Sequence, residues 1–154
     1  MMKNPGYPEL WAKLRALTEG ETDEVALMAT VACELYHHFE RFDWVGFYRV
    51  TEPGLMKVGP YQGGHGCLVI PFGRGVCGAA AAAEKTMLVA DVDAFPDHIA
   101  CASSTRSEIV VPVHDRNRRL IAVLDIDSDT PDNFDAADRE NLEALVAEVF
   151  GKPG

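Results

Sequence analysis

The chain has 154 residues, of which 47% are hydrophobic and 25% charged, and its formal net charge is −10. These values are typical of a globular domain with its own core and exclude a disordered protein. The negative charge disfavours nucleic acids and anionic membranes as partners, because both attract basic proteins. No apolar run could span a bilayer, and the N-terminus lacks a secretory signal pattern, so we expect a cytoplasmic protein that forms one domain over residues 1–154 and binds a small molecule.

The first part of the chain predicts two helices followed by three strands. Apolar residues recur at helical spacing over residues 8–17 and 23–39. Three segments rich in apolar, aromatic and β-branched residues come next, at 44–50, 55–59 and 67–71, and a hairpin turn separates the first two. We expect the two helices to cover one face of the sheet.

The second part begins with glycines that open a short alanine-rich helix at 79–85, followed by a short strand at 87–90. A long loop over 91–106 leads to two strands, 108–113 and 120–126, which should pair in antiparallel fashion. Asp135 is placed to cap a last helix that runs to Phe150. The pattern predicts an α+β domain with a central antiparallel sheet of about six strands and terminal helices packed on one face. Long loops in compact domains are often functional, so we expect the site near residues 91–106.

The cysteines give the first indication of chemistry. Cys67, Cys77 and Cys101 lie in one central stretch beside glycine, histidine or predicted turns, whereas Cys33 lies in a predicted apolar helix and should belong to the core. In the cytosol such thiols are more often catalytic, sensing or metal-binding than structural. Cys77 also falls near the start of a predicted helix, where the helix dipole should lower its pKa. We therefore expect redox chemistry, with three buried and inert thiols as the alternative.

Two further interpretations apply to the same stretch. Residues 73–78 (GRGVCG) fit the GxGxxG dinucleotide fingerprint, but the chain offers too few strands and helices for a doubly wound sheet, so a tight turn is favoured. Four residues are of zinc-ligand type, namely Cys67, Cys77, His98 and Cys101. Structural zinc sites usually have closely paired ligands, and only the last two are so spaced, so we expect no metal.

Acidic and aromatic residues predict a binding pocket. Asp125 and Asp127 alternate with apolar residues on a predicted strand, so both should project from one face, and Glu108 could join them. Neighbouring carboxylates repel unless a cation or a shared proton lies between them. They could form an acidic pocket for an ammonium group, with one carboxyl kept protonated, or a solvated sheet face. Trp44 and Tyr48 should also share a face, either in the core or as aromatic walls of the pocket.

Taken as a set, these residues resemble the free methionine-R-sulfoxide reductases, a single-domain branch of the GAF fold. The matching stretches are 44–48 (WVGFY), 59–63 (GPYQG), 73–78 (GRGVCG), 98–101 (HIAC), 107–112 (SEIVVP) and 124–128 (LDIDS). The chain departs from the family pattern at Ala102, where an aspartate is expected, and at Ser104-Thr105. These departures bear on the loop around Cys101 and on the pKa of its thiol.

The resemblance implies a single GAF domain that reduces the R epimer of free methionine sulfoxide. It implies that Cys101 is the nucleophile and Cys67 its resolving partner, with Cys77 a second candidate for either role. The family's substrate pocket falls on five residues of this chain: Trp44, Tyr48, Glu108, Asp125 and Asp127.

The mechanism that we expect is thiolate attack, a sulfenic acid and an intramolecular disulfide, which thioredoxin then reduces. This mechanism needs no cofactor, and a homodimer is left open. The alternative from another class is a GAF-type sensor that binds a small molecule or reports redox state without turnover; such sensors are usually attached to an output domain, for which this chain should have no room.

Overall fold

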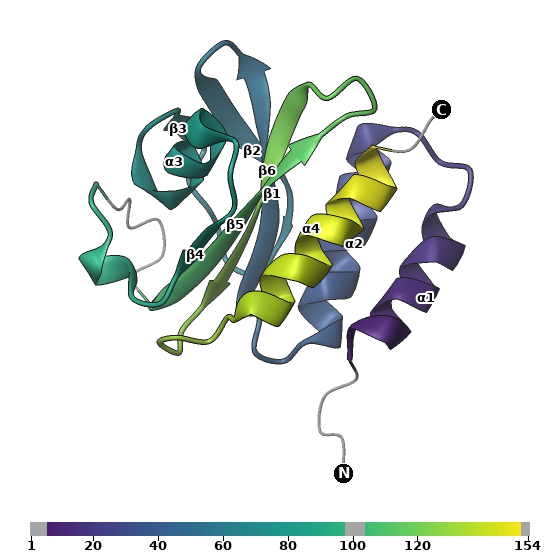
Figure 1. Cartoon of the computed structure of the whole chain (residues 1–154), viewed down its shortest axis with the longest axis horizontal. Helices are drawn as coiled ribbons and strands as arrows, with labels where there is room; N and C mark the ends of the chain where they lie inside the picture. The colour runs from purple at the N-terminus through teal and green to yellow at the C-terminus, as the bar shows by residue number, and fades with distance from the viewer. Residues whose placement is uncertain (1–5, 98–103, 152–154) are drawn as a thin grey trace.

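A computed structural model describes residues 6–97 and 104–151 of the chain (Figure 1). In these residues a six-stranded sheet has the order β3-β2-β1-β6-β5-β4, and every neighbouring pair is antiparallel. The strands are β1 (Trp44–Glu52), β2 (Leu55–Gln62), β3 (Val69–Pro71), β4 (Met87–Val89), β5 (Ser107–His114) and β6 (Leu120–Ser128).

The helices lie on both faces of the sheet. They are α1 (Tyr7–Thr18), α2 (Glu24–His38), α3 (Gly75–Ala83) and α4 (Ala136–Phe150), with a 3₁₀ turn η1 (Val92–Ala94) after β4. Figure 1 shows α2 and α4 against one face, α1 outside them, and α3 on the opposite face. The prediction that the first two helices cover the sheet is therefore right for α2, whereas α1 packs on α2 and α4. Among the described residues, none of the helices combines the length and the hydrophobicity that a bilayer span needs.

The alternation of residues along each strand divides the core into two clusters. Val45 and Phe47 of β1 point toward α2 and α4, where they join the larger cluster. Trp44 and Tyr48 of the same strand point the other way and join the cluster beneath α3. Successive side chains of a strand alternate between faces, so each strand contributes to both clusters.

Side-chain caps define the starts of the long helices. The Asp23 carboxylate accepts a hydrogen bond from the Ala26 backbone N–H at the start of α2 (2.9 Å). At the start of α4, Asp135 and Asp138 form a capping box, in which each side chain accepts from the other residue's backbone N–H. Caps of this kind satisfy N–H groups that have no acceptor within the helix.

The predicted elements are all present, with shifted ends. Strand β2 continues to Gln62, because Tyr61 and Gln62 pair with Gly46 and Val45 of β1. Strand β3 starts at Val69, which leaves Cys67 in the loop that precedes it. The predicted loop at 91–106 contains η1, and its residues 98–103 lie outside the described residues.

Candidate active site

The register of β5 and β6 brings three carboxyl groups onto the face beneath α3. Glu108 pairs with Asp127 across these two strands, and Asp125 lies two residues before Asp127, on the same face of β6. Glu108 is 6% exposed and Asp125 4% exposed. The interpretation of these residues as a solvated sheet face is therefore wrong, because they form a buried acidic floor.

Helix α3 covers this floor, and glycines allow its close approach. Gly73 and Gly75 have φ values of +83° and +65°, a region that favours glycine, and they turn the chain from β3 into the helix. A Cβ atom on Gly78 would lie 2.5 Å from the Pro71 carbonyl oxygen. The GRGVCG segment is thus a tight turn, and the antiparallel sheet excludes the parallel strand–helix–strand unit of a dinucleotide fold.

A cavity of about 40 Å³ lies between α3 and the acidic floor. Its lining comprises Trp44, Tyr48, His65, Gly66, Ile70, Arg74, Gly75, Val76, Cys77, Thr105, Glu108, Asp125 and Asp127. All five pocket residues predicted from the sequence line this one cavity.

Aromatic rings form one wall of the cavity. The rings of Trp44 and Tyr48 stack with their centroids 5.9 Å apart, and the Trp44 indole N–H donates to the Gly64 carbonyl oxygen (2.7 Å). Gly46 leaves room for this arrangement, since a Cβ atom there would lie 2.5 Å from the Trp44 ring and 2.4 Å from the Tyr61 Cβ atom. The Trp44 ring is therefore positioned both by its hydrogen bond to Gly64 and by the space that Gly46 leaves.

Burial and mutual repulsion change the acidity of the carboxyl groups. Burial, followed by the nearby charges of Asp125 and Asp127, raises the pKa of Glu108 well above its usual 4.5. Burial, followed by the charge of Asp125, likewise raises the pKa of Asp127 well above 3.8. Oδ1 of Asp127 is buried and accepts no hydrogen bond from any described residue. A raised pKa favours the protonated form of a carboxyl group, and a protonated carboxyl can donate a hydrogen bond.

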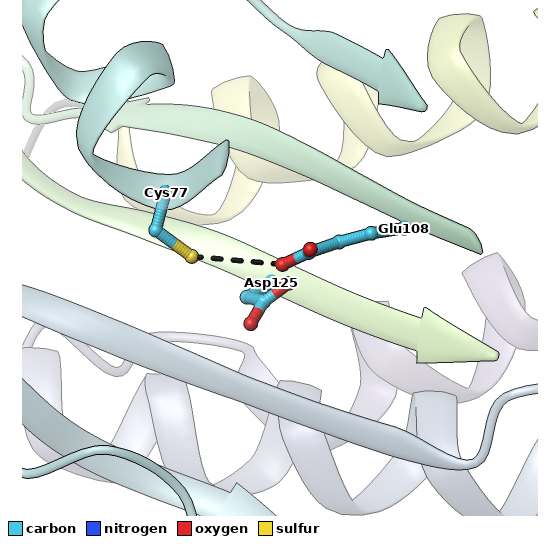
Figure 2. A group of neighbouring side chains, drawn as sticks. All are labelled: Cys77, Glu108 and Asp125. Atoms are coloured by element: carbon cyan, nitrogen blue, oxygen red, sulfur yellow. Dashed lines mark hydrogen bonds between the residues drawn. The ribbon is translucent and has the colours of Figure 1, made fainter. Parts of the chain in front are cut away.

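Cys77 points from α3 toward the acidic floor (Figure 2). Its thiol donates to Oε2 of Glu108 over 3.8 Å. Burial, followed by the charges of Asp125 and Glu108, raises the pKa of the Cys77 thiol well above 9.0. The prediction that the helix dipole lowers this pKa was wrong, because loss of hydration and two neighbouring carboxyl groups outweigh the partial charge at the helix end.

The other cysteines have different surroundings. Cys67 is disulfide-bonded, whereas Cys33 and Cys77 are free thiols. Cys33 is half-buried on α2, with its sulfur 3.7 Å from Nδ1 of His37, so its prediction as a core residue was wrong. Cys101 and His98 lie outside the described residues.

One group of side chains has the geometry to hold a metal ion. Ligand atoms of Cys77, Glu108 and Asp125 all lie within 4.8 Å of one another (Figure 2). This is not the zinc set considered from the sequence, since Cys67 is disulfide-bonded and the two acidic residues were absent from that set. The same three side chains line the cavity.

Several lining residues carry no signal in the sequence that predicts a function. Arg74 and His65 are the cationic or ionisable basic side chains of the described lining, and Gly66 lies against the aromatic wall. The signal for Arg74 was its place inside the GRGVCG motif, which was interpreted for its glycines alone. His65 lies on a glycine-rich loop with no periodicity that could place it.

Comparison with known families and proteins places this fold. A model of the GAF domain matches residues 23–149. The chain is 44% identical to protein YtsP of Bacillus subtilis, over 91% of this chain and 86% of that protein. It is 40% identical to the free methionine-R-sulfoxide reductase of Escherichia coli, over 97% of this chain and 89% of that enzyme.

Solved structures agree over nearly the whole chain. The reduced form of fRMsr of Staphylococcus aureus superposes with a TM-score of 0.91 at 38% identity, covering 97% of this chain and 96% of that one. Free methionine-R-sulfoxide reductase from Neisseria meningitidis, in complex with its substrate, has a TM-score of 0.88 at 42% identity, covering 98% and 93% of the two chains. The chain therefore belongs to the GAF-domain family and, within it, to the free methionine-R-sulfoxide reductases, a family of oxidoreductases.

Proposed function

We propose that this protein reduces free L-methionine-R-sulfoxide to L-methionine in the cavity between α3 and the sheet. The observation that carries the proposal is the buried floor of three carboxyl groups beside an aromatic wall, in a chain related over nearly its full length to reductases of this substrate. Free methionine sulfoxide supplies an ammonium group for the carboxyl groups and a methyl sulfoxide end for the aromatic wall.

The ammonium group of the substrate would pair with the acidic floor. A cation among carboxyl groups relieves the repulsion that raises the pKa values of Glu108 and Asp127. The methyl sulfoxide end would lie against Trp44 and Tyr48, because aromatic faces bind methyl and sulfur groups favourably. The exposed residues His65 and Arg74 also line this cavity.

Cys101 is the nucleophile in this proposal, on the basis of the family resemblance, since the residue lies outside the described structure. Its thiolate attacks the sulfoxide sulfur, and the oxygen that gains negative charge takes a proton. Glu108 or Asp127 is suited to supply that proton, because the raised pKa of each carboxyl group favours its protonated form. The attack joins the Cys101 sulfur to the substrate sulfur. The protonated oxygen then passes to the Cys101 sulfur as the substrate S–O bond and the new S–S bond break, so that methionine leaves and Cys101 is oxidised to a sulfenic acid.

We propose Cys67 as the thiol that resolves this sulfenic acid. Its condensation with Cys101 would form a disulfide and release water. Two observations favour Cys67 over Cys77: Cys67 is disulfide-bonded, and Cys77 is a free, buried thiol whose raised pKa disfavours the reactive thiolate. An external dithiol such as thioredoxin would return both cysteines to thiols and be oxidised itself.

The proposal invokes no metal or organic cofactor. Elemental analysis of the purified protein would test whether Cys77, Glu108 and Asp125 hold an ion. A cytoplasmic location and a homodimer remain predictions.

The test is a reductase assay with separate sulfoxide epimers. The purified protein, supplied with dithiothreitol or with thioredoxin, thioredoxin reductase and NADPH, should form methionine from the R epimer and not from the S epimer. Cys101→Ser should abolish turnover, and Cys33→Ser, which changes a thiol remote from the cavity, should retain it. Thermal stabilisation by the substrate without turnover would instead indicate a binding protein, and full activity of Cys101→Ser would exclude the proposed nucleophile.

A further inference from the structure

The acidic floor creates an electrostatic problem for a free amino acid. Three carboxyl groups line the cavity, namely those of Glu108, Asp125 and Asp127. They suit the ammonium group, but the same molecule carries an α-carboxylate that they would repel. A site for the whole zwitterion therefore needs a positive group elsewhere on its walls.

Arg74 is the permanently charged cation of the described lining. It is the N-cap residue of α3, on the side of the cavity that faces the sheet carrying the carboxyl groups. No salt bridge or side-chain hydrogen bond joins Arg74 to another residue in the part of the chain that the structure describes. It also does not rank among the main influences on the pKa values of Glu108 and Asp127. The positive charge of Arg74 is thus not used to neutralise the carboxyl groups of the acidic floor.

The backbone N–H groups next to Arg74 also present partial positive charge to the cavity. Gly75, Val76 and Cys77 are the first residues of α3, and all three line the cavity. The first N–H groups of a helix have no acceptor within it, and no side chain caps this helix end. The positive end of the helix therefore reinforces Arg74 at the same wall.

We propose that Arg74 binds the α-carboxylate of the substrate and is the residue that selects a free carboxyl terminus. This inference rests on the proposed function and adds a second polar anchor to it: the ammonium group binds to the floor and the carboxylate to the α3 wall. A guanidinium presents paired donors that match both carboxylate oxygens. An amide or a peptide-bonded carbonyl lacks the charge and gains little from Arg74.

The experiment compares two substrates that differ only in this group, L-methionine-R-sulfoxide and its α-carboxamide. The wild-type protein should prefer the acid. Arg74→Ala should lower kcat/KM for the acid by about 10- to 100-fold, the usual loss for a charged hydrogen-bonded contact, mainly through KM. It should leave the amide unchanged, and Arg74→Lys should recover part of the preference because it keeps the charge without the paired donors.

Arg116→Ala is the matched control, because Arg116 lies in the exposed turn between β5 and β6 and does not line the cavity. This variant should keep the wild-type preference. Equal losses for acid and amide in Arg74→Ala would mean that the substitution disturbs α3, and an unchanged preference would mean that Arg74 does not contact the carboxylate. Either result overturns the proposal.

Calorimetric binding of L-methionine and L-methioninamide separates this inference from the proposed function. Binding needs no turnover, so the ratio of the two affinities tests Arg74 even if the protein proves to reduce neither sulfoxide. If the affinity for L-methionine divided by that for L-methioninamide falls about tenfold or more in Arg74→Ala, the assignment of Arg74 is supported. A ratio that does not change contradicts it.

Discussion

Glu108 and Asp127 lie directly opposite each other on β5 and β6, with both carboxyl groups on the buried side of the sheet. Like charges at opposed positions on neighbouring strands destabilise a sheet. Burial, followed by the charge of Asp125, raises the pKa of both groups, which favours a proton on the pair. The paired strands thus hold two carboxyl groups of raised pKa side by side in the cavity.

The stability of the ligand-free protein should fall as the pH rises above about 4.5, until the folded-state pKa of Glu108 is passed. Glu108 has a higher pKa in the folded than in the unfolded state, where it is near 4.5, so the folded state holds more protons over this interval. Each such group can lower the free energy of unfolding by up to about 1.4 kcal/mol per pH unit until its folded-state pKa is passed. Urea denaturation across this pH range measures the slope.

Glu108→Gln should flatten that slope, because glutamine fills the same space without titrating. Glu52→Gln is the control, since Glu52 is exposed at the end of β1. An equal slope in the wild-type protein and in Glu108→Gln would show that Glu108 does not titrate abnormally.

Asp138 should be a main determinant of stability on the opposite side of the sheet. It is 1% exposed, caps α4, and accepts hydrogen bonds from the Tyr7 hydroxyl (2.6 Å) and the Arg41 guanidinium (3.1 Å). Asp138→Ala would leave these donors without their acceptor and should lower the free energy of unfolding by about 3 kcal/mol. Denaturation with guanidinium chloride at neutral pH measures this loss.

The control for Asp138 is the exposed ion pair between Arg15 and Glu148. Glu148→Ala should change the free energy of unfolding by no more than about 1 kcal/mol, because water screens exposed pairs. The Arg41 and Tyr7 contacts also lower the pKa of Asp138, although its burial acts against them. Its contribution should therefore be complete above pH 3.8 and be lost as the pH falls through its folded-state pKa.

Gly46→Ala should damage the aromatic wall. The added methyl group would lie 2.5 Å from the Trp44 ring and force it to move. We expect destabilisation of about 1–3 kcal/mol from overpacking, together with a shifted tryptophan fluorescence spectrum and a raised KM for the sulfoxide. Gly64→Ala should change none of these, because nothing lies within 4 Å of the added atom. Identical fluorescence in both variants would argue against the contact with Trp44.

Cys77 should resist alkylation in the folded protein. Its thiol is 4% exposed and its pKa is raised, so both access and ionisation are unfavourable. At about pH 8, iodoacetamide should label Cys33 faster than Cys77 in the native state, and both at similar rates in urea. Mass spectrometry of peptides reads both sites in one sample. Rapid native labelling of Cys77 would contradict its assignment as a protonated, buried donor to Glu108.

The fold was predictable because its local signals agree with one another. The apolar spacing of residues 23–39 and the cap at Asp135 predicted α2 and α4 within one or two residues of their observed ends. The extension of β2 to Gln62 was not predicted, because Gly59, Pro60 and Gln62 are poor strand formers. Pairing with β1 holds them in the strand, a tertiary effect that outweighs local preference.

The site was partly predictable for the same reason. The alternation in residues 123–127 placed Asp125 and Asp127 on one face, and strand position indicated Trp44, Tyr48 and Glu108 as further candidates. The resemblance assigned all five to the substrate pocket, and all five line the cavity. The acidity of Cys77 could not be inferred, since it depends on carboxyl groups 31 or more residues away in the chain. Arg74 escaped notice because no periodicity marks an arginine that faces a cavity.

The amino-acid sequence by itself determined which elements form, which side chains share a face, and which family the chain resembles, because these follow from local spacing and motifs. Only the tertiary structure decided that α3 closes over Glu108, Asp125 and Asp127, so that burial outweighs the helix dipole at Cys77. The physical reason is that pKa values depend on hydration and on charges a few ångströms away, and these distances exist only after strands far apart in the chain have paired.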